Sequence, residues 1–306
     1  MLRPAAEKSS NIYSKEMASE GQATRDPLAP SLPSNDRCPF CAAAALRSLG
    51  AADGIGLKRC TACGSVMSDT SVPEPSEYGS AYYEGSYLAF ETERLAFLRR
   101  LLGRFGDAAG RLVVDCGCGA GFALDVLAGR GWRPVGIEPS PAGAAIAARR
   151  GHVVVRGSAS VLPAASRVAG AVVLLDVLAH LDDPSAALRE TARVLAPGGR
   201  VLVKTPHRPA WAYRLATCLP GRVARGILHL PHQRYAVSRA GLVALLTAAG
   251  FGSVEVKPSW EAIPFRSRLS GSRGRRLRAL LVGAFELLYG RPSSVATGVA
   301  NPAAAP

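Results

Sequence analysis

Residues 113–122, Val-Val-Asp-Cys-Gly-Cys-Gly-Ala-Gly-Phe, decide the fold of this 306-residue chain. An apolar run ends at Asp115, glycine then recurs at positions 117, 119 and 121, and the apolar pattern resumes at Phe122. This order predicts a buried strand, a tight turn and a helix. Because glycine has no Cβ, a ligand can lie against the turn at the carboxyl edge of the sheet, where open α/β sheets bind ligands. The spacing differs from the Gly-x-Gly-x-x-Gly pattern of dinucleotide-binding folds.

A second strand and an acidic residue follow at the distance that suits ribose binding. Residues 133–138, Arg-Pro-Val-Gly-Ile-Glu, predict a strand that ends at Glu138, 23 positions after Asp115. A carboxylate about 20 residues beyond a glycine loop can accept hydrogen bonds from both hydroxyls of a ribose. Ser140 and Pro141 then predict the N-cap and first residue of a helix. We expect the first two strands to be adjacent and joined by a right-handed crossover.

The alternation of strands and helices continues toward the C-terminus. Residues 168–177 form a long apolar run that reaches Asp176, and His180 follows four positions later. Pro184 opens a predicted helix to Leu195, and Pro197-Gly198-Gly199 separates it from a strand. The further expected elements are that strand over 200–205, a helix over 242–249, and strands over 253–257 and 295–300.

Four of the seven cysteines form two Cys-x-x-Cys pairs near the N-terminus. An 18-residue gap separates Cys38 and Cys41 from Cys60 and Cys63. In each pair a tight turn aims two thiolates at one metal, so the spacing indicates a tetrahedral zinc site with a hairpin between the pairs. Disulfide bonds are the alternative, which a reducing compartment disfavours. Because four thiolates close the coordination sphere, the zinc is expected to be structural and not catalytic.

Three further blocks, GIEPSP, LLDVLAHLDDP and RVLAPGGRVLVKTPH, follow the glycine loop in order. With that loop and the cysteine pairs, they make the chain similar to class I S-adenosylmethionine (SAM) dependent methyltransferases that carry an N-terminal zinc ribbon. That group includes sugar and natural-product methyltransferases, and its core is similar to the ubiquinone-biosynthesis O-methyltransferases. The resemblance implies an α/β fold, a Rossmann-like three-layer sandwich with a seven-stranded, mostly parallel sheet, plus the small ribbon.

The expected organisation of the chain has four parts. They are a disordered leader over 1–36, the zinc ribbon over 37–70, a linker with a tyrosine-rich helical lid over 71–108, and the methyltransferase domain over 109–306, with a helical cap inserted at 207–237.

The resemblance also implies which residues bind the cofactor and which act on the acceptor. Asp115 would orient the glycine loop or the amino group of SAM, and Glu138 would grip the ribose. Asp176 would lie beside the reactive methyl group, and His180 is the expected general base because neutral histidine accepts a proton near pH 7. His180 could instead brace its loop. The expected cofactor-binding set is Tyr83, Asp115, Gly117, Cys118, Gly119, Gly121, Glu138, Ser158, Ala159 and Asp176, and the catalytic candidates are His180, Asp176 and His232.

Two positions depart from the family pattern. Ser158 stands where many relatives have an acid that holds the adenine amino group, and Ala179 stands where many have glutamate before the histidine. A hydroxyl binds more weakly than a carboxylate. These departures keep open a degenerate fold that binds without catalysis.

The positive charge of the chain is concentrated in its last third. From residue 200 onward there are 16 Lys and Arg against 3 acidic residues, and the net charge of the whole chain is +14. A solvated helix face accounts for such a cluster as well as an anionic substrate, a membrane surface or nucleic acid does. Few aromatic residues interleave with the arginines at 266–278, and the net charge between Cys38 and Cys63 is only +2, which argues against RNA binding.

The sequence therefore predicts SAM-dependent methyl transfer to a small-molecule acceptor, such as a sugar, a natural product or a carrier-linked intermediate with an anionic group. The alternatives are an RNA methyltransferase and the degenerate, non-catalytic fold. No window of 18 uninterrupted apolar residues predicts a membrane span, and the N-terminus lacks the apolar core of a secretory signal. A cytoplasmic protein is expected.

Overall fold

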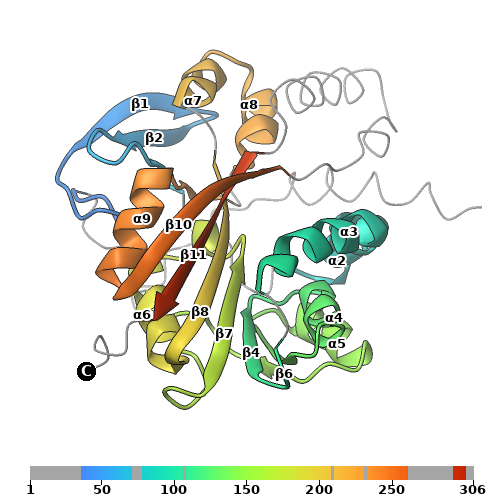
Figure 1. Cartoon of the computed structure of the whole chain (residues 1–306). Helices are drawn as coiled ribbons and strands as arrows, with labels where there is room; N and C mark the ends of the chain where they lie inside the picture. The colour runs from blue at the N-terminus through green and yellow to red at the C-terminus, as the bar shows by residue number, and fades with distance from the viewer. Residues whose placement is uncertain are drawn as a thin grey trace, which may run out of the picture.

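Two sheets organise the chain, a central one of seven strands and a smaller one of four strands (Figure 1). The computed structural model describes residues 36–70, 78–105, 108–207, 210–230, 233–260 and 292–300. The expected leader, apart from Asp36, lies outside these residues, as do His232, the arginines at 266–278 and residues 71–77. Among the described residues, no helix is long and apolar enough to cross a membrane.

The central sheet has the strand order β6-β5-β4-β7-β8-β11-β10. Neighbouring strands from β6 to β8 are parallel, and β11 runs antiparallel to both β8 and β10. Chain order reverses on either side of β4, which makes a topological switch point where such sheets bind ligands. The predicted fold, including the adjacency of the first two strands, is confirmed. The strands are β4 Leu112–Cys116, β5 Arg133–Glu138, β6 Val154–Arg156, β7 Ala169–Leu175, β8 Leu195–Pro206, β10 Phe251–Trp260 and β11 Pro292–Ala300.

Apolar side chains cover both faces of this sheet, because successive residues of a strand point to opposite sides. Val113 and Val173 pack with one set of helices, whereas Val114 and Val172 pack with the other. The first set is α2 Ser80–Ser86, α3 Glu91–Leu102, α4 Phe122–Ala128 and α5 Pro141–Arg149; the second is α6 Pro184–Val194 and α9 Arg239–Ala248 (Figure 1). Short 3-10 turns lie at η4 Leu88–Phe90, η5 Gly103–Phe105 and η6 Leu178–His180.

Side-chain caps fix where three of these helices begin. Ser140 accepts a hydrogen bond from the Gly143 N–H, with Pro141 in the first turn, as the sequence predicts. Asp183 caps α6 and Ser238 caps α9 in the same way. The start of each helix is therefore set locally, next to the end of the preceding strand or loop.

The cysteine-rich segment forms the smaller sheet. Strands β1 Leu46–Ala52 and β2 Ile55–Cys60 make the expected hairpin, and β3 Val66–Ser68 pairs with β2. Asp53 and Gly54 connect the hairpin with positive φ at both positions, the backbone that a two-residue Asp-Gly turn favours. The fourth strand is β9 Tyr235–Ala236, which comes from a segment more than 160 residues later in the chain.

Two helices from that later segment complete an accessory module around the small sheet. They are α7 Ala210–Thr217 and α8 Gly221–Leu228, and both lie beside β1 (Figure 1). Leu57 and Val66 of the sheet share one buried cluster with Tyr213 and Ile227 of the helices. Asp53 in the hairpin turn forms an ion pair with Arg225 of α8. The described residues of segments 36–70 and 210–238 thus pack as one module.

Candidate functional site

The glycine loop turns back over the end of β4. Gly117, Gly119 and Gly121 all have positive φ, at +71°, +53° and +86°. A Cβ at Gly121 would lie 3.0 Å from His152 Cδ2 and one at Gly117 would lie 2.8 Å from Val177 Cγ2. At Gly119 the nearest atom would be an ordinary 3.5 Å away, on the Tyr83 ring. Gly117 and Gly121 are therefore required by packing, whereas Gly119 faces the site.

Glu138 joins the loop to the end of β5. Its Oε2 accepts from the Gly119 N–H at 2.7 Å and its Oε1 accepts from the Ser140 N–H at 2.8 Å. The side chain is buried, and burial raises the pKa of Glu138 while the two backbone hydrogen bonds oppose that rise. Each carboxylate oxygen can accept a second hydrogen bond, so the group can hold the loop and also receive hydroxyl donors.

Asp115 lies beneath the loop at the end of β4. It is 2% exposed, and burial together with the nearby Glu138 carboxylate raises the pKa of Asp115 to about 8. A buried acid with this pKa is mostly protonated at neutral pH. A cation bound nearby would favour its ionised form.

Asp176 stands at the end of β7, next to β4. Its backbone has a φ of +61°, and its Oδ2 lies 2.5 Å from the Nζ of the buried Lys204 on β8. Its Oδ1 is buried and has no hydrogen-bond partner within the described part of the chain. An ammonium group is the natural donor for such an oxygen. Lys204 was not predicted from the sequence, although a lysine inside the apolar run of β8 is a visible signal.

His180 lies at the end of the 3-10 turn that follows β7. Its Nδ1 is 3.4 Å from the hydroxyl of Tyr78, and the two rings meet edge to face. The Ser140 hydroxyl donates to the Tyr78 carbonyl at 2.8 Å. Tyr78 therefore links His180 to the turn beyond Glu138. The sequence alone assigns Tyr78 no role, and its place in a tyrosine-rich segment is the signal that points to it.

The tyrosine-rich segment covers the glycine loop. Tyr83 is 4% exposed and its ring lies against Gly119, while its hydroxyl reaches the position that a Cβ at Gly143 would take. Burial, together with the charge of Glu138, raises the pKa of Tyr83. Burial raises the pKa of the neighbouring Tyr87 to about 12, and the two rings are 5.4 Å apart. The structure thus places Tyr83 over Glu138 and the loop.

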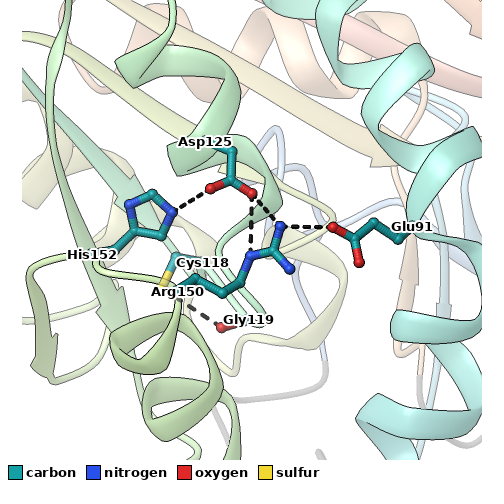
Figure 2. A network of polar contacts seen from close by, with 6 residues as sticks. All are labelled: Glu91, Cys118, Gly119, Asp125, Arg150 and His152. Carbon is teal, nitrogen blue, oxygen red and sulfur yellow. Dashed lines mark hydrogen bonds and ion pairs between the residues drawn. The ribbon is translucent and has the colours of Figure 1, made fainter.

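An ionic network lies behind the loop, among helices α3, α4 and α5 (Figure 2). Asp125 of α4 contacts His152 Nε2 at 2.7 Å and Arg150 at 2.5 Å, and Arg150 reaches Glu91 of α3 at 2.8 Å. The His152 ring also packs against Gly121. The network therefore fixes α3, α4 and the end of α5 together.

The remaining predicted cofactor contacts lie on either side of β5. Ser158 is exposed just beyond β6, where its hydroxyl accepts from the Ser160 N–H, and Ala159 is buried. Cys118 is buried under the loop, with its sulfur against Gly136, and burial raises the pKa of its thiol. Its own N–H donates to the Ile137 carbonyl. The side chain of Cys118 therefore packs into the sheet and does not face Tyr83.

The four N-terminal thiols converge as a metal site would require. Cys38 Sγ lies 3.6 Å from Cys63 Sγ, and Cys41 Sγ lies 3.6 Å from Cys60 Sγ. All four sulfur atoms lie within 4.8 Å of one another. Tetrahedral zinc with Zn–S bonds of about 2.3 Å separates its sulfur ligands by roughly 3.8 Å. The donor set and its spacing fit zinc.

Comparison with solved structures supports the fold. A chain in the Haloferax volcanii complex of the Trm112 methyltransferase activator with its candidate methyltransferase superposes with a TM-score of 0.57 at 20% identity, covering 76% of this chain and 100% of that one. A Haemonchus contortus phosphoethanolamine N-methyltransferase 2, solved with S-adenosylhomocysteine, superposes with a TM-score of 0.55 at 16% identity, covering 76% of this chain and 61% of that one.

Curated relatives are similar over the central part of the chain. A probable SAM-dependent methyltransferase of Mycolicibacterium smegmatis is 37% identical over 145 residues, which are 47% of this chain and 52% of that protein. The match thus spans about half the length of that relative. A ubiquinone biosynthesis O-methyltransferase of Azorhizobium caulinodans is 31% identical over 183 residues, 55% of this chain and 72% of that protein.

A family model agrees with the site geometry. The family model described as "Methyltransferase domain" matches residues 90–256, which are more than half of the chain. The matched region includes the glycine loop, Glu138 and Asp176. The chain belongs to the methyltransferase domain family.

Proposed function

We propose that this protein is a SAM-dependent methyltransferase that acts on a small-molecule acceptor carrying an anionic group. The observation that carries the proposal is the contact of Glu138 with the Gly119 and Ser140 N–H groups at the switch point of the sheet. That contact sets a carboxylate beside Gly119, which has no side chain of its own, and an adenosyl ligand requires such close approach to the backbone once the Tyr83 ring that covers it moves aside.

The residues around this contact fit the parts of SAM. Glu138 would accept hydrogen bonds from the ribose, and Gly119 would lie against the methionine portion. Asp176 Oδ1, which lacks a partner within the described part of the chain, would accept from the ammonium. Ser158 and Ala159 would flank the adenine beyond β6. SAM supplies an electrophilic methyl group on a sulfonium sulfur when it is bound.

On the acceptor side, the chain supplies positioning and a proton acceptor. The His180 imidazole would accept the hydroxyl proton of the acceptor, and its contact with Tyr78 would fix the orientation of the ring. Tyr83, buried over the loop, would exclude water from the methyl group. The catalytic candidates are His180, which would accept the proton, and Asp176, which would also lie beside the reactive methyl group; His232, outside the described residues, remains a third.

The four cysteines would hold one structural zinc ion. Closed coordination by four thiolates leaves no position for a substrate, so the metal would stabilise the ribbon and take no part in methyl transfer. Thiolate ligands would be kept reduced in a cytoplasmic compartment, where we expect the protein to act.

A relative and the charge of the ribbon both favour a small-molecule acceptor over RNA. The ubiquinone biosynthesis methyltransferase that resembles this chain is named for a small-molecule pathway. The ribbon carries almost balanced charge over residues 36–70, with four basic against three acidic side chains. Salt-dependent RNA retention would favour the RNA-methyltransferase alternative, and absence of SAM binding would favour the degenerate fold.

The test is isothermal titration of the purified, zinc-loaded chain with S-adenosylhomocysteine (SAH). We expect micromolar binding and one zinc per chain. Glu138→Gln should weaken SAH binding at least tenfold, because a charged hydrogen-bond acceptor typically contributes about 1.5–3 kcal/mol. The matched control is Glu255→Gln, which changes an exposed glutamate paired with Lys257 on β10.

Two outcomes would contradict the proposal. Wild-type protein that is folded and zinc-loaded but does not bind SAH would exclude methyl transfer from SAM. SAH binding of equal affinity in wild type and Glu138→Gln would remove the ribose assignment.

A further inference from the structure

One segment, residues 234–238, lies between the cysteine-rich ribbon and the loop that carries His180. We call this segment the strap. It contains β9 and the N-cap of α9, and it touches the ribbon on one side and η6 on the other. Its central residues, Tyr235 to Val237, are at most 5% exposed. The strap is therefore in direct contact with both neighbours and buried between them.

On the ribbon side, the strap is bonded to a metal-binding cysteine. The Ser238 hydroxyl donates to the Cys63 carbonyl at 2.5 Å, and the Ser238 N–H donates to the Ser65 hydroxyl at 3.1 Å. The Cys63 thiol lies 3.3 Å from the same Ser65 hydroxyl. Phe40, which stands between two of the cysteines, packs edge to face on Tyr235 at 5.1 Å. The strap therefore contacts the four-cysteine site through Cys63 and through Phe40.

The ribbon also holds the other end of the strap. Ser68 donates to the Arg234 carbonyl through its N–H at 2.9 Å and through its hydroxyl at 3.2 Å. Strand β9 pairs with β3 between these two anchors. The ribbon thus contacts the strap at both ends and along β9.

On the catalytic side, Arg234 fastens the loop around His180. Its N–H donates to the Ala179 carbonyl at 2.9 Å, and its Nη1 lies 2.6 Å from Asp182 Oδ1. The Arg234 side chain is only 6% exposed, whereas that of Asp182 is 62% exposed. These two bonds hold the residue before His180 and a residue two positions after it. A buried guanidinium that pairs with a carboxylate makes a strong, directional hydrogen bond, because its donors lie in a rigid plane.

We infer that Arg234 is a positioning residue through which the metal-loaded ribbon holds His180 in place. The ribbon then acts on the acceptor side of the site and not on the cofactor side, since its contacts with the strap lead to 178–182 and not to Glu138 or the glycine loop. The catalytic importance of this contact rests on the proposed function, whereas the coupling between the ribbon and residues 178–182 depends only on the fold.

The test is hydrogen–deuterium exchange of the full, zinc-loaded chain, read on peptides that cover 178–183, with SAH titration on the same samples. Arg234→Met should speed exchange in 178–183 at least tenfold and leave SAH affinity within about threefold of wild type. Cys63→Ser, which removes a metal ligand, should speed exchange in the same peptides. Arg234→Lys, which keeps the charge but loses the planar fork, should restore part of the protection.

A matched control is available in α6, next to the same loop. Arg189→Met removes an exposed arginine that lies 3.5 Å from Asp183, so it breaks a neighbouring Arg–Asp pair without touching the strap. It should leave exchange in 178–183 within about twofold of wild type. If Arg234→Met fails to fold, Asp182→Asn breaks the same pair from its exposed partner and decides the question.

The outcomes separate this inference from the proposed function. Unchanged exchange in 178–183 in Asp182→Asn and in folded Arg234→Met would overturn the coupling. Faster exchange throughout the chain, with lost SAH binding in both variants, would make Arg234 a general stability residue and would also overturn it. Failure of the wild type to bind SAH would refute the proposed function alone, because the exchange result would still decide the coupling.

Discussion

Three carboxylates meet at the carboxyl edge of the sheet, and each is kept in place differently. Glu138 is held by two backbone N–H groups, Asp176 is paired with Lys204, and Asp115 is buried with a pKa of about 8. Burying acids near one another costs stability. Such an arrangement is expected where a cationic ligand compensates the charge.

The raised pKa of Asp115 predicts a measurable pH-dependence of folding stability. Its pKa rises from an ordinary 3.8 to about 8 on folding, so the unfolded chain ionises first and folding stability falls as pH rises through this range. Asp115→Asn removes this loss. We expect the variant to gain roughly 2 kcal/mol over wild type between pH 6 and pH 8.5, or several degrees in Tm.

Thermal denaturation at the two pH values measures this gain. Asp36→Asn, a change at an exposed aspartate, is the control. An Asp115→Asn minus wild-type difference in Tm that does not grow with pH would contradict the assigned pKa.

At the residue scale, the sequence predicts residues whose role follows from a nearby motif. It does not predict contacts between residues that are far apart in the sequence. Asp115, Glu138 and the loop glycines follow from strand ends and spacing. The pairing of Lys204 with Asp176 depends on which strand lies beside β7, and that neighbour is fixed only by sheet topology. For the same reason, the sequence offered His180 but not its partner Tyr78.

At the scale of elements, the glycines of the loop differ in what requires them: packing explains some, and the proposed ligand explains Gly119. A Cβ at Gly121 would meet the His152 ring and Ala147 at 3.0 and 3.1 Å, so packing explains that glycine. A Cβ at Gly119 would meet only ordinary contacts with Tyr83 and Tyr87. We therefore attribute Gly119 to the ligand.

Alanine substitutions test this division. Gly119→Ala should cost about 1 kcal/mol of stability, because φ at +53° is accessible to alanine with modest strain, but should weaken SAH binding at least tenfold. Gly121→Ala should cost about 2 kcal/mol or more, because strain and steric overlap add. Denaturant unfolding and SAH titration give both quantities; stability losses in the opposite order would contradict the assignment.

The elements themselves could largely be predicted, because apolar periodicity and helix caps are local signals. Strand β9 could not, since two residues, Tyr235 and Ala236, carry no periodic pattern. Its existence depends on the docking of the ribbon against η6. The sequence therefore presented residues 37–70 and 207–237 as separate segments, whereas the described parts of both pack together.

At the scale of the whole molecule, the proposed cofactor side and the proposed acceptor side of the site contact different modules. The sheet with α3, α4 and α5 surrounds the glycine loop, and the network of Asp125, Arg150 and Glu91 links α3, α4 and the end of α5 (Figure 2). The ribbon and strap support the His180 loop. A methyltransferase needs both sides to be aligned, because methyl transfer is an in-line displacement between donor and acceptor.

The most direct test of the central claim is a crystal structure of the zinc-loaded protein with SAH. We predict SAH at the end of β4, with its ribose hydroxyls on the Glu138 carboxylate, its amino group near Asp176, and the Tyr83 ring moved away from Gly119. A complex in which SAH lies elsewhere, or crystals grown at saturating SAH without ligand at this site, would contradict the account.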